Sequence, residues 1–222
     1  MKKYFSLIKF SHTIFAMPFA LIGFFLATKS YEFKWISLLH VVLCMVFARS
    51  AAMAFNRYID RDIDKKNKRT SSIREIPNGT ITAKNALIFV IINSLLFVAT
   101  TYLINTLCLT LSPIALLIIL GYSYTKRFTP LCHLILGLGL ALAPIGAYLT
   151  VSNQFDLMPI LFSSAVLFWV SGFDIIYSLQ DEEFDKTQKL YSIPVIMGKK
   201  NALQLSKFFH ILSVITLAFI SN

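Results

Sequence analysis

Apolar residues in this chain gather in blocks of about 17 to 23, the length at which an α-helix crosses the hydrocarbon core of a bilayer. Within lipid, every backbone N–H and C=O must be satisfied inside its own segment, so these blocks are expected to be helices. Hydrophobic residues make up 56% of the 222 residues and charged residues only 14%, which is too few to cover a water-soluble particle of this size. The sequence therefore predicts an all-α fold, a multi-pass transmembrane helical bundle.

We expect this bundle to form a single domain over residues 1–222, with seven membrane spans. The predicted spans are residues 10–28, 35–55, 86–102, 106–124, 131–151, 157–179 and 203–220. Basic residues then divide unequally between the two sides of the membrane, because Lys29 and Lys34 are the only ones in the connections of one side. Seventeen fall on the other side, namely Lys2, Lys3, Lys9, Arg57, Arg61, Lys65, Lys66, Lys68, Arg69, Arg74, Lys84, Lys126, Arg127, Lys186, Lys189, Lys199 and Lys200.

Loops rich in Lys and Arg stay on the cytoplasmic side of a membrane. The N-terminus and the two long loops, after the second and the sixth span, are therefore expected to be cytoplasmic, in a bacterial inner or plasma membrane. The same distribution accounts for the net charge of +10, so the lipid bilayer is the expected partner and no nucleic acid is required.

Most of the acidic residues form two clusters, where the second and the sixth span end on this basic side. They are Asp60, Asp62 and Asp64 in the first cluster, and Asp174, Asp181, Glu182, Glu183 and Asp185 in the second. Asn56, Asp60 and Asp64 are four residues apart, so on a continued helix they share one stripe. Asp62 would point roughly 200° away from Asp60.

A second stripe is expected from Asp174, Asp181 and Asp185, because Asp181 and Asp185 each lie within about 20° of Asp174 on a continuous helix. Like charges on one stripe repel each other unless a cation lies between them. Carboxylates and an amide oxygen are ligands that Mg²⁺ prefers, and the basic residues that follow could hold the outer oxygens of a diphosphate. The sequence therefore predicts two Mg²⁺ sites and an anionic phosphate ligand.

Three stretches resemble the motifs of the UbiA superfamily of intramembrane aromatic prenyltransferases. The segment 56–64, NRYIDRDID, with Arg69-Thr70 and the segment 74–79, REIPNG, resembles the first aspartate-rich motif of that superfamily. The segment 174–185, DIIYSLQDEEFD, resembles the second, and the segment 122–127, YSYTKR, a third signature. The motifs occur in the right order over essentially the whole chain, which looks closest to the 4-hydroxybenzoate polyprenyltransferase branch.

The resemblance implies roles for individual residues. Asn56, Asp60 and Asp64 would bind one Mg²⁺ ion, and Asp181 and Asp185 a second, with the four aspartates acting as the catalytic residues. The residues implied to hold the diphosphate of a polyprenyl diphosphate are Lys68, Arg69, Lys126 and Arg127.

Two further residues are implied to contact the aromatic acid acceptor. Arg49 lies two helical turns before Asn56 on the same stripe, within the bilayer, where an arginine is costly and usually has a function. The matching position in the family pairs with the carboxylate of the acceptor, although a structural pairing of Arg49 stays an alternative. Asp174 is a candidate to orient the acceptor or a basic partner.

The implied function is Mg²⁺-dependent transfer of a polyprenyl group to the ring of an aromatic acid such as 4-hydroxybenzoate, in ubiquinone or menaquinone biosynthesis. The family usually has nine transmembrane helices, so a chain with seven is expected to be short at its C-terminus. The alternatives are a truncated, inactive relative and a membrane transporter with an acid-lined pathway. A CDP-alcohol phosphotransferase would need glycine after its aspartate pair, whereas Lys65 follows Asp64.

Overall fold

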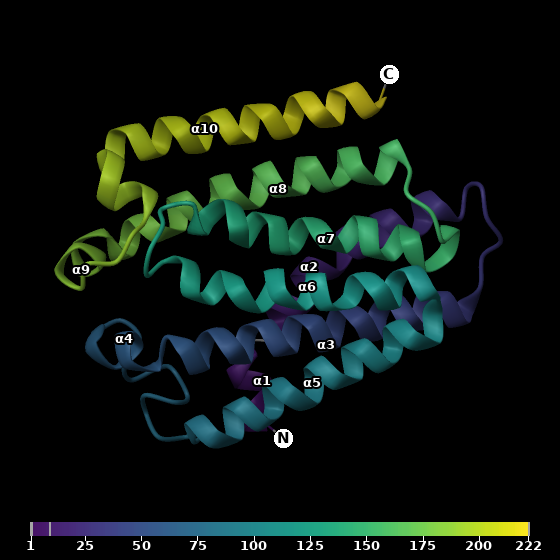
Figure 1. The fold of residues 1–222 in the computed structure, drawn as a ribbon. Helices are drawn as coiled ribbons and strands as arrows, with labels where there is room; N and C mark the ends of the chain where they lie inside the picture. The colour runs from purple at the N-terminus through teal and green to yellow at the C-terminus, as the bar shows by residue number, and fades with distance from the viewer. Residues whose placement is uncertain (1, 9, 222) are drawn as a thin grey trace. The chain divides into compact units, whose positions relative to one another are not determined.

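The computed structural model describes residues 2–8 and 10–221, and these form helices and turns, with no strand among them (Figure 1). Lys9, one of the basic residues counted on the predicted cytoplasmic side, lies outside the described residues. The helices are α1 (Lys2–Leu7), α2 (Phe10–Ala27), α3 (Trp35–Ile59), α4 (Arg61–Lys66), α5 (Ala83–Ile104), α6 (Thr106–Thr125), α7 (Cys132–Ser152), α8 (Leu157–Ser178), α9 (Glu182–Thr187) and α10 (Ile193–Ser221).

Each of the seven predicted spans coincides with one of these helices, and the all-α, multi-pass fold is confirmed. Six helical segments are long and apolar enough to cross a membrane, and the seventh, α2, contributes a shorter apolar stretch, Ala16–Ala27. Apolar side chains also point outward from these helices, because Leu117 is 73% exposed, Phe219 67% and Leu95 64%. Such surfaces suit contact with lipid, so the chain is a multi-pass membrane protein.

The chain divides into two compact units, where the expectation was one domain. The first unit contains residues 1–18 and 33–123, and in it α3 lies along α5 (Figure 1). The short helix α1 packs on this pair, where Leu7 is fully buried in a cluster with Met53 and Ile81. The loop between α4 and α5 folds back toward α1, because the Ser6 hydroxyl donates a hydrogen bond to the buried Glu75 at 2.5 Å.

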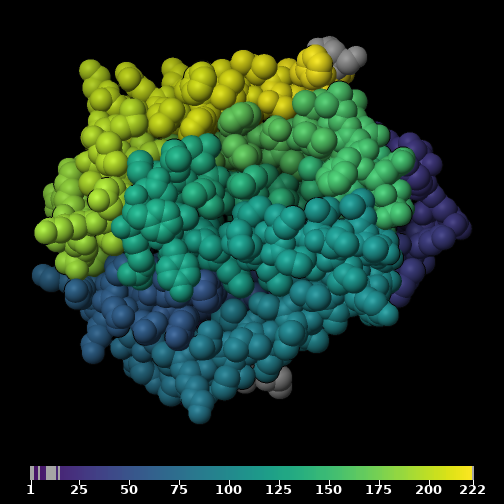
Figure 2. Space-filling view, viewed as in Figure 1, coloured from purple at the N-terminus to yellow at the C-terminus, as the bar shows by residue number. Residues whose placement is uncertain are grey.

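The second unit contains residues 19–32 and 124–222, and in it α8 packs against both α7 and α10. Two buried serines of α10 reach across to backbone carbonyl oxygens of α8. Ser206 Oγ donates to Gly172 O at 2.7 Å, and Ser213 Oγ donates to Ala165 O at 2.9 Å. Both pairs repeat after seven residues, the spacing that keeps one face of a helix toward a neighbour. Figure 2 shows the side chains of α10 (yellow) lying directly against those of α8 (green).

Close approach of α7 and α8 depends on Gly137. A Cβ atom at this position would lie 2.7 Å from Leu167 O and would also meet Ser171 Oγ, both on α8. Small residues at a crossing let two backbones come near each other in a membrane. Gly146, nine residues further along α7, has no such neighbour within 4 Å. Gly137 therefore marks a point of close backbone contact between α7 and α8.

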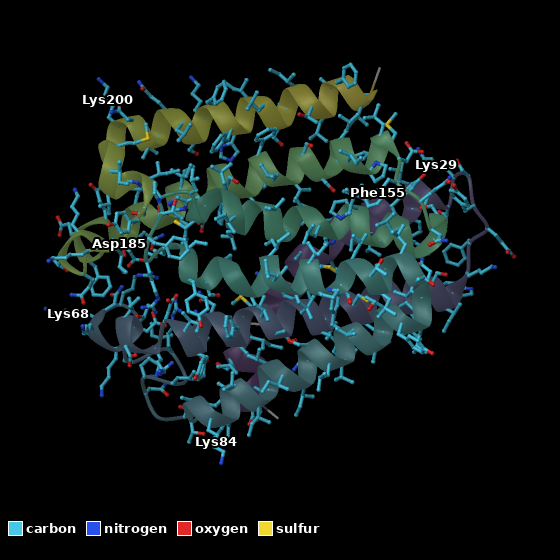
Figure 3. The ribbon with its side chains drawn as sticks, in the orientation of Figure 1. Lys29, Lys68, Lys84, Phe155, Asp185 and Lys200 are labelled. Atoms are coloured by element: carbon cyan, nitrogen blue, oxygen red, sulfur yellow. The ribbon has the colours of Figure 1, made fainter. Side chains whose placement is uncertain are left out.

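A break at Gly198 divides α10, which begins ten residues before the predicted span. Gly198 has φ +74° and ψ 160°, a conformation that residues with a Cβ rarely adopt. The segment Ile193–Met197 before the break is short, and the long part after it carries Ser206 and Ser213. In the second unit, Asp185 and Lys200 lie at one end of the helices and Lys29 and Phe155 at the other (Figure 3).

Candidate functional site

The first acidic cluster forms where α3 ends and α4 begins. The backbone N–H of Asp60 bonds to Asn56 O at 2.9 Å, and that of Asp64 bonds to Asp60 O at 2.7 Å, although Asp60 itself, with ψ 4°, lies outside both helices. Asn56 Nδ2 also donates to Asp60 Oδ2 at 3.0 Å. Asn56 and Asp60 therefore lie side by side one turn apart, as their spacing predicts, and Asp64 follows one hydrogen-bonded turn after Asp60. Asp62 points elsewhere, with a side chain 78% exposed and 3.9 Å from the Arg61 guanidinium.

Asp64 is the buried member of this cluster, with a side chain only 7% exposed. Arg74 Nη1 lies 2.9 Å from its Oδ2, and Thr70 Oγ1 donates to its backbone oxygen at 2.9 Å. Burial raises the pKa of the Asp64 carboxyl above its ordinary value, while the positive charges of Arg74 and Arg57 act in the opposite direction. A bound cation would favour the charged carboxylate for the same reason as the two guanidiniums do.

The second acidic cluster departs from the predicted geometry. A continuous helix was expected to align Asp174, Asp181 and Asp185, but α8 ends at Ser178 and a 3₁₀ turn, Leu179–Asp181, precedes α9. A 3₁₀ turn advances about 120° per residue and an α-helix about 100°, so three residues add roughly 60° of rotation. The prediction of one shared stripe is therefore wrong for this cluster, and Asp174 and Asp185 have different partners.

Asp185 (labelled in Figure 3) is fully buried in α9. Its partner is Lys126, which follows α6. Lys126 Nζ lies 2.8 Å from Asp185 Oδ1, and the Ser192 hydroxyl also interacts with this carboxylate. A buried carboxylate is costly unless it is paired and hydrogen-bonded. The predicted metal ligand Asp185 and the predicted diphosphate ligand Lys126 thus lie side by side.

The remaining predicted residues fall into both units. Lys68 is exposed in the loop after α4, and Arg69, the next residue, donates its backbone N–H to Asn67 Oδ1 at 2.9 Å. Arg127 is also exposed, directly after Lys126. The first unit brings together Asn56, Asp60 and Asp64, and the second brings together Lys126 and Asp185.

The two predicted acceptor ligands lie within helices. Arg49 is half-buried in α3, interacts electrostatically with Tyr122 of α6, and has a buried Nε with no hydrogen-bond partner among the described residues. Asp174 lies in α8, with Oδ2 2.7 Å from Nδ1 of the buried His133 of α7. Arg49 therefore has an unused donor, and Asp174 already has a basic partner.

The donors in both clusters fit Mg²⁺. Within the described residues, no group of three or more His, Cys, Asp and Glu side chains converges as a complete metal centre. Mg²⁺ usually binds through one or two carboxylates together with substrate phosphates, so such a centre is not required. Asp60, Asp64 and the amide of Asn56 offer oxygen ligands at one cluster. At the other, Asp185 offers buried carboxylate oxygens beside Lys126.

Sequence reasoning missed the residues that support these carboxylates. Arg74 and Thr70 contact Asp64 from a loop, and no helical periodicity relates a loop residue to a helix. Arg57 was counted only as a basic loop residue, yet it is 5% exposed, with Nη1 3.4 Å from Asn56 Oδ1. The signal available for Arg57 was its position next to Asn56 on a helix that continues past the apolar run.

Comparison with known proteins identifies the family. The profile of the UbiA prenyltransferase family matches residues 16–221. The chain therefore belongs to the UbiA prenyltransferase family. Among curated relatives, the 4-hydroxybenzoate octaprenyltransferase of Aliivibrio fischeri (strain MJ11) is 33% identical over 168 residues, which cover 74% of this chain and 57% of the relative. The chain thus matches little more than half the length of this relative.

Solved structures show the same fold. A UbiA homolog from Aeropyrum pernix K1 is 36% identical, with a TM-score of 0.85 over 93% of this chain and 77% of the homolog. A UbiA homolog from Archaeoglobus fulgidus, bound to GPP and Mg²⁺, has a TM-score of 0.81 at 23% identity, over 98% of this chain and 77% of the homolog. At 23% identity, the comparison with the A. fulgidus homolog shows only that the two chains have the same fold.

Proposed function

We propose that this chain transfers a polyprenyl group from a polyprenyl diphosphate to the ring of an aromatic acid such as 4-hydroxybenzoate. The reaction would depend on Mg²⁺ and would serve ubiquinone or menaquinone biosynthesis. The observation that carries this proposal is the pair of buried carboxylates, Asp64 and Asp185, each beside a basic side chain and each just beyond the end of an apolar helix. The names of the curated relatives support it.

In the proposed reaction, the bond between the allylic carbon and the diphosphate oxygen breaks, and the electron pair leaves with the diphosphate. The ring carbon next to the phenol hydroxyl forms the new bond and then loses a proton. Mg²⁺, when bound, would supply positive charge to the leaving diphosphate. The ligands would be Asn56, Asp60 and Asp64 for one ion and Asp181 and Asp185 for the other.

The basic residues would complete the phosphate contacts, because Lys and Arg form strong charge-assisted hydrogen bonds with phosphate oxygens. The residues proposed for this role are Lys68, Arg69, Lys126 and Arg127. The apolar helices would exclude water from the reacting carbon and accommodate the polyprenyl tail. The proposed orientation puts the N-terminus and both motif loops in the cytoplasm.

Arg49 is proposed to bind the carboxylate of the acceptor. Its buried Nε has no hydrogen-bond partner among the described residues, and a guanidinium can pair with a planar carboxylate through two parallel hydrogen bonds. We expect Arg49→Ala to raise the KM for 4-hydroxybenzoate while the KM for the polyprenyl diphosphate stays nearly unchanged. Arg49→Lys should restore only part of the affinity, because a point charge lacks the fork geometry. Loss of diphosphate binding in the alanine variant would place Arg49 at the phosphate site.

The catalytic test uses membranes incubated with a panel of aromatic acceptors and polyprenyl diphosphates, with and without Mg²⁺. Asp60→Asn, Asp64→Asn, Asp181→Asn and Asp185→Asn should each lower turnover at least about 100-fold, the scale of losing a main electrostatic stabiliser. Asp62→Asn is the matched control, because the Asp62 side chain points away from the stripe. The proposal would be overturned if Asp62→Asn lowered turnover as much as the other four substitutions do. It would also be overturned if no pair of substrates gave any turnover.

The proposed orientation has its own test. A single cysteine placed at Lys66 or at Glu183 should react with a membrane-impermeant maleimide from the cytoplasmic side. A cysteine at Gln154 should react from the opposite side. Labelling of Lys66 and Glu183 from different sides would be incompatible with a site that uses both acidic clusters.

A further inference from the structure

His133 is a buried histidine whose two ring nitrogens are both occupied. It is 2% exposed, its Nδ1 lies 2.7 Å from Asp174 Oδ2, and its Nε2 accepts a hydrogen bond from the backbone N–H of Ile193 at 3.2 Å. A backbone N–H can only donate, so Nε2 carries no proton. The geometry therefore assigns a neutral imidazole whose single N–H, at Nδ1, donates to Asp174.

The hydrogen bond from Ile193 fixes the start of α10. The connection from α9 to α10 carries a second anchor, because the Tyr191 N–H donates to Lys126 O at 2.8 Å. Lys126 is also the residue whose ammonium lies 2.8 Å from the Asp185 carboxylate. One short segment is thus tied to Lys126 and, two residues later, to His133. The segment connects α9, which carries Asp185, to α10, whose first residue, Ile193, donates its backbone N–H to His133.

We propose that His133 is a positioning residue for the Asp185 carboxylate. Asp174 holds the ring in one tautomer and one orientation, and the ring holds Ile193, which keeps the segment after α9 against Lys126 and Asp185. Carboxylates that bind a metal must be held near their productive geometry by supporting contacts, which is the effect this arrangement has. The proposal rests on the proposed function, in which Asp185 is a metal ligand, and it gives Asp174 a supporting role in place of contact with the acceptor.

Two substitutions of His133 each remove one of the two hydrogen bonds of its ring. In His133→Asn, the amide nitrogen falls near the position of Nδ1 and can still donate to Asp174, but nothing accepts from Ile193. In His133→Gln, the longer side chain can bring its amide oxygen near the position of Nε2 and accept from Ile193, while the bond to Asp174 is lost. Asp174→Asn keeps a neutral oxygen that can accept from Nδ1.

The first measurement is amide hydrogen exchange in detergent micelles, which requires neither metal nor substrate. We expect His133→Asn to speed exchange at the Tyr191 and Ile193 amides at least about tenfold, as for a hydrogen bond lost from a buried segment. His133→Gln should stay close to the wild type. The Ile81 amide, which donates to a backbone oxygen within the first unit, is the internal control and should not change.

The second measurement is Mn²⁺ binding by electron paramagnetic resonance, with Mn²⁺ alone as the probe. His133→Asn should lower, about tenfold, the affinity for the Mn²⁺ ion whose binding is abolished by Asp185→Asn. The affinity for the Mn²⁺ ion whose binding is abolished by Asp64→Asn should stay unchanged. A wild-type protein that binds no Mn²⁺ would contradict the metal in the proposed function, whereas the exchange measurement would still decide the role of His133.

Three results would overturn the positioning role. One is unchanged exchange at Tyr191 and Ile193 in His133→Asn. Another is a glutamine variant that exchanges as fast as the asparagine variant, which would show that ring packing matters and the hydrogen bond does not. The third is an Asp174→Asn variant that raises the KM for the acceptor with normal exchange and normal Mn²⁺ binding, since Asp174 would then contact the acceptor. If His133→Asn does not fold, the glutamine and Asp174→Asn variants decide between the same outcomes.

Discussion

Gly137→Ala should loosen the contact between α7 and α8, and its cost follows from the atoms that a methyl group would meet. The new Cβ would lie 2.7 Å from Leu167 O, a backbone atom that cannot turn aside, and it would also meet Ser171 Oγ. Overpacking of this kind costs about 1–3 kcal/mol. The Ser171 hydroxyl, which donates to Leu167 O of its own helix at 2.7 Å, would have to turn away from the new methyl group.

Gly146→Ala is the matched control on the same helix. Replacing glycine with alanine inside a helix gains about 1 kcal/mol, and a Cβ at Gly146 meets nothing within 4 Å. Both variants receive this gain, so the free energies of unfolding should differ by about 1–3 kcal/mol, with Gly137→Ala the less stable. The assay is reversible unfolding in mixed micelles with increasing dodecyl sulfate, followed by circular dichroism.

A second-site variant tests the cause of the loss. Ser171→Ala removes the hydroxyl that meets the new methyl group, so the double variant with Gly137→Ala should recover part of the stability but not all, because Leu167 O remains. Equal unfolding midpoints for Gly137→Ala and Gly146→Ala would refute the close backbone contact. Gly137 also lies one turn after His133, so exchange at the Ile193 amide should rise in the destabilised variant alone.

Three other substitutions have defined outcomes. Arg74→Ala leaves the Asp64 carboxylate without its nearest guanidinium and should lower the free energy of unfolding by about 1–3 kcal/mol, less than the 3–5 kcal/mol typical of fully buried pairs because Arg74 is 20% exposed. In combination with Asp64→Asn, its effect should shrink in a double-mutant cycle. Ser213→Ala should cost about 0.6 kcal/mol in the same unfolding assay, as one hydrogen bond between membrane helices. Asp156→Ala removes the side chain that caps α8 and should cost about 1 kcal/mol, with fraying at the start of α8 visible by hydrogen exchange.

Apolar run length predicted where the helices lie, since all seven predicted spans are helical. The prediction failed at the beginning of α10, which starts at Ile193 and not at Leu203. Gly198 and the two lysines after it interrupt the apolar run, so nothing local shows that helix exists before them. The hydrogen bond from Ile193 to His133 comes from a residue 60 positions away in the sequence, and periodicity carries no information about such a contact.

The candidate site was predictable where it follows helical spacing. Asn56, Asp60 and Asp64 follow one another by two i→i−4 backbone hydrogen bonds, although Asp60 separates α3 from α4. The same reasoning failed between Asp174 and Asp185, because it assumed that α8 continues without a 3₁₀ turn. Partners supplied by loops and by other helices could not be derived from spacing at all.

The contact between α8 and α10 has a consequence for how these two helices tolerate sequence change. Ser206 and Ser213 donate to carbonyl oxygens, which every residue possesses, so α8 must supply only room, whereas α10 must supply the hydroxyl. Saturation mutagenesis should therefore give two different profiles. Positions 165 and 172 should reject residues by volume, whatever their polarity. Positions 206 and 213 should prefer serine and, where it fits, threonine, with alanine costing about 0.6 kcal/mol for the lost hydrogen bond. Two helices that share one interface would then accumulate substitutions under different rules.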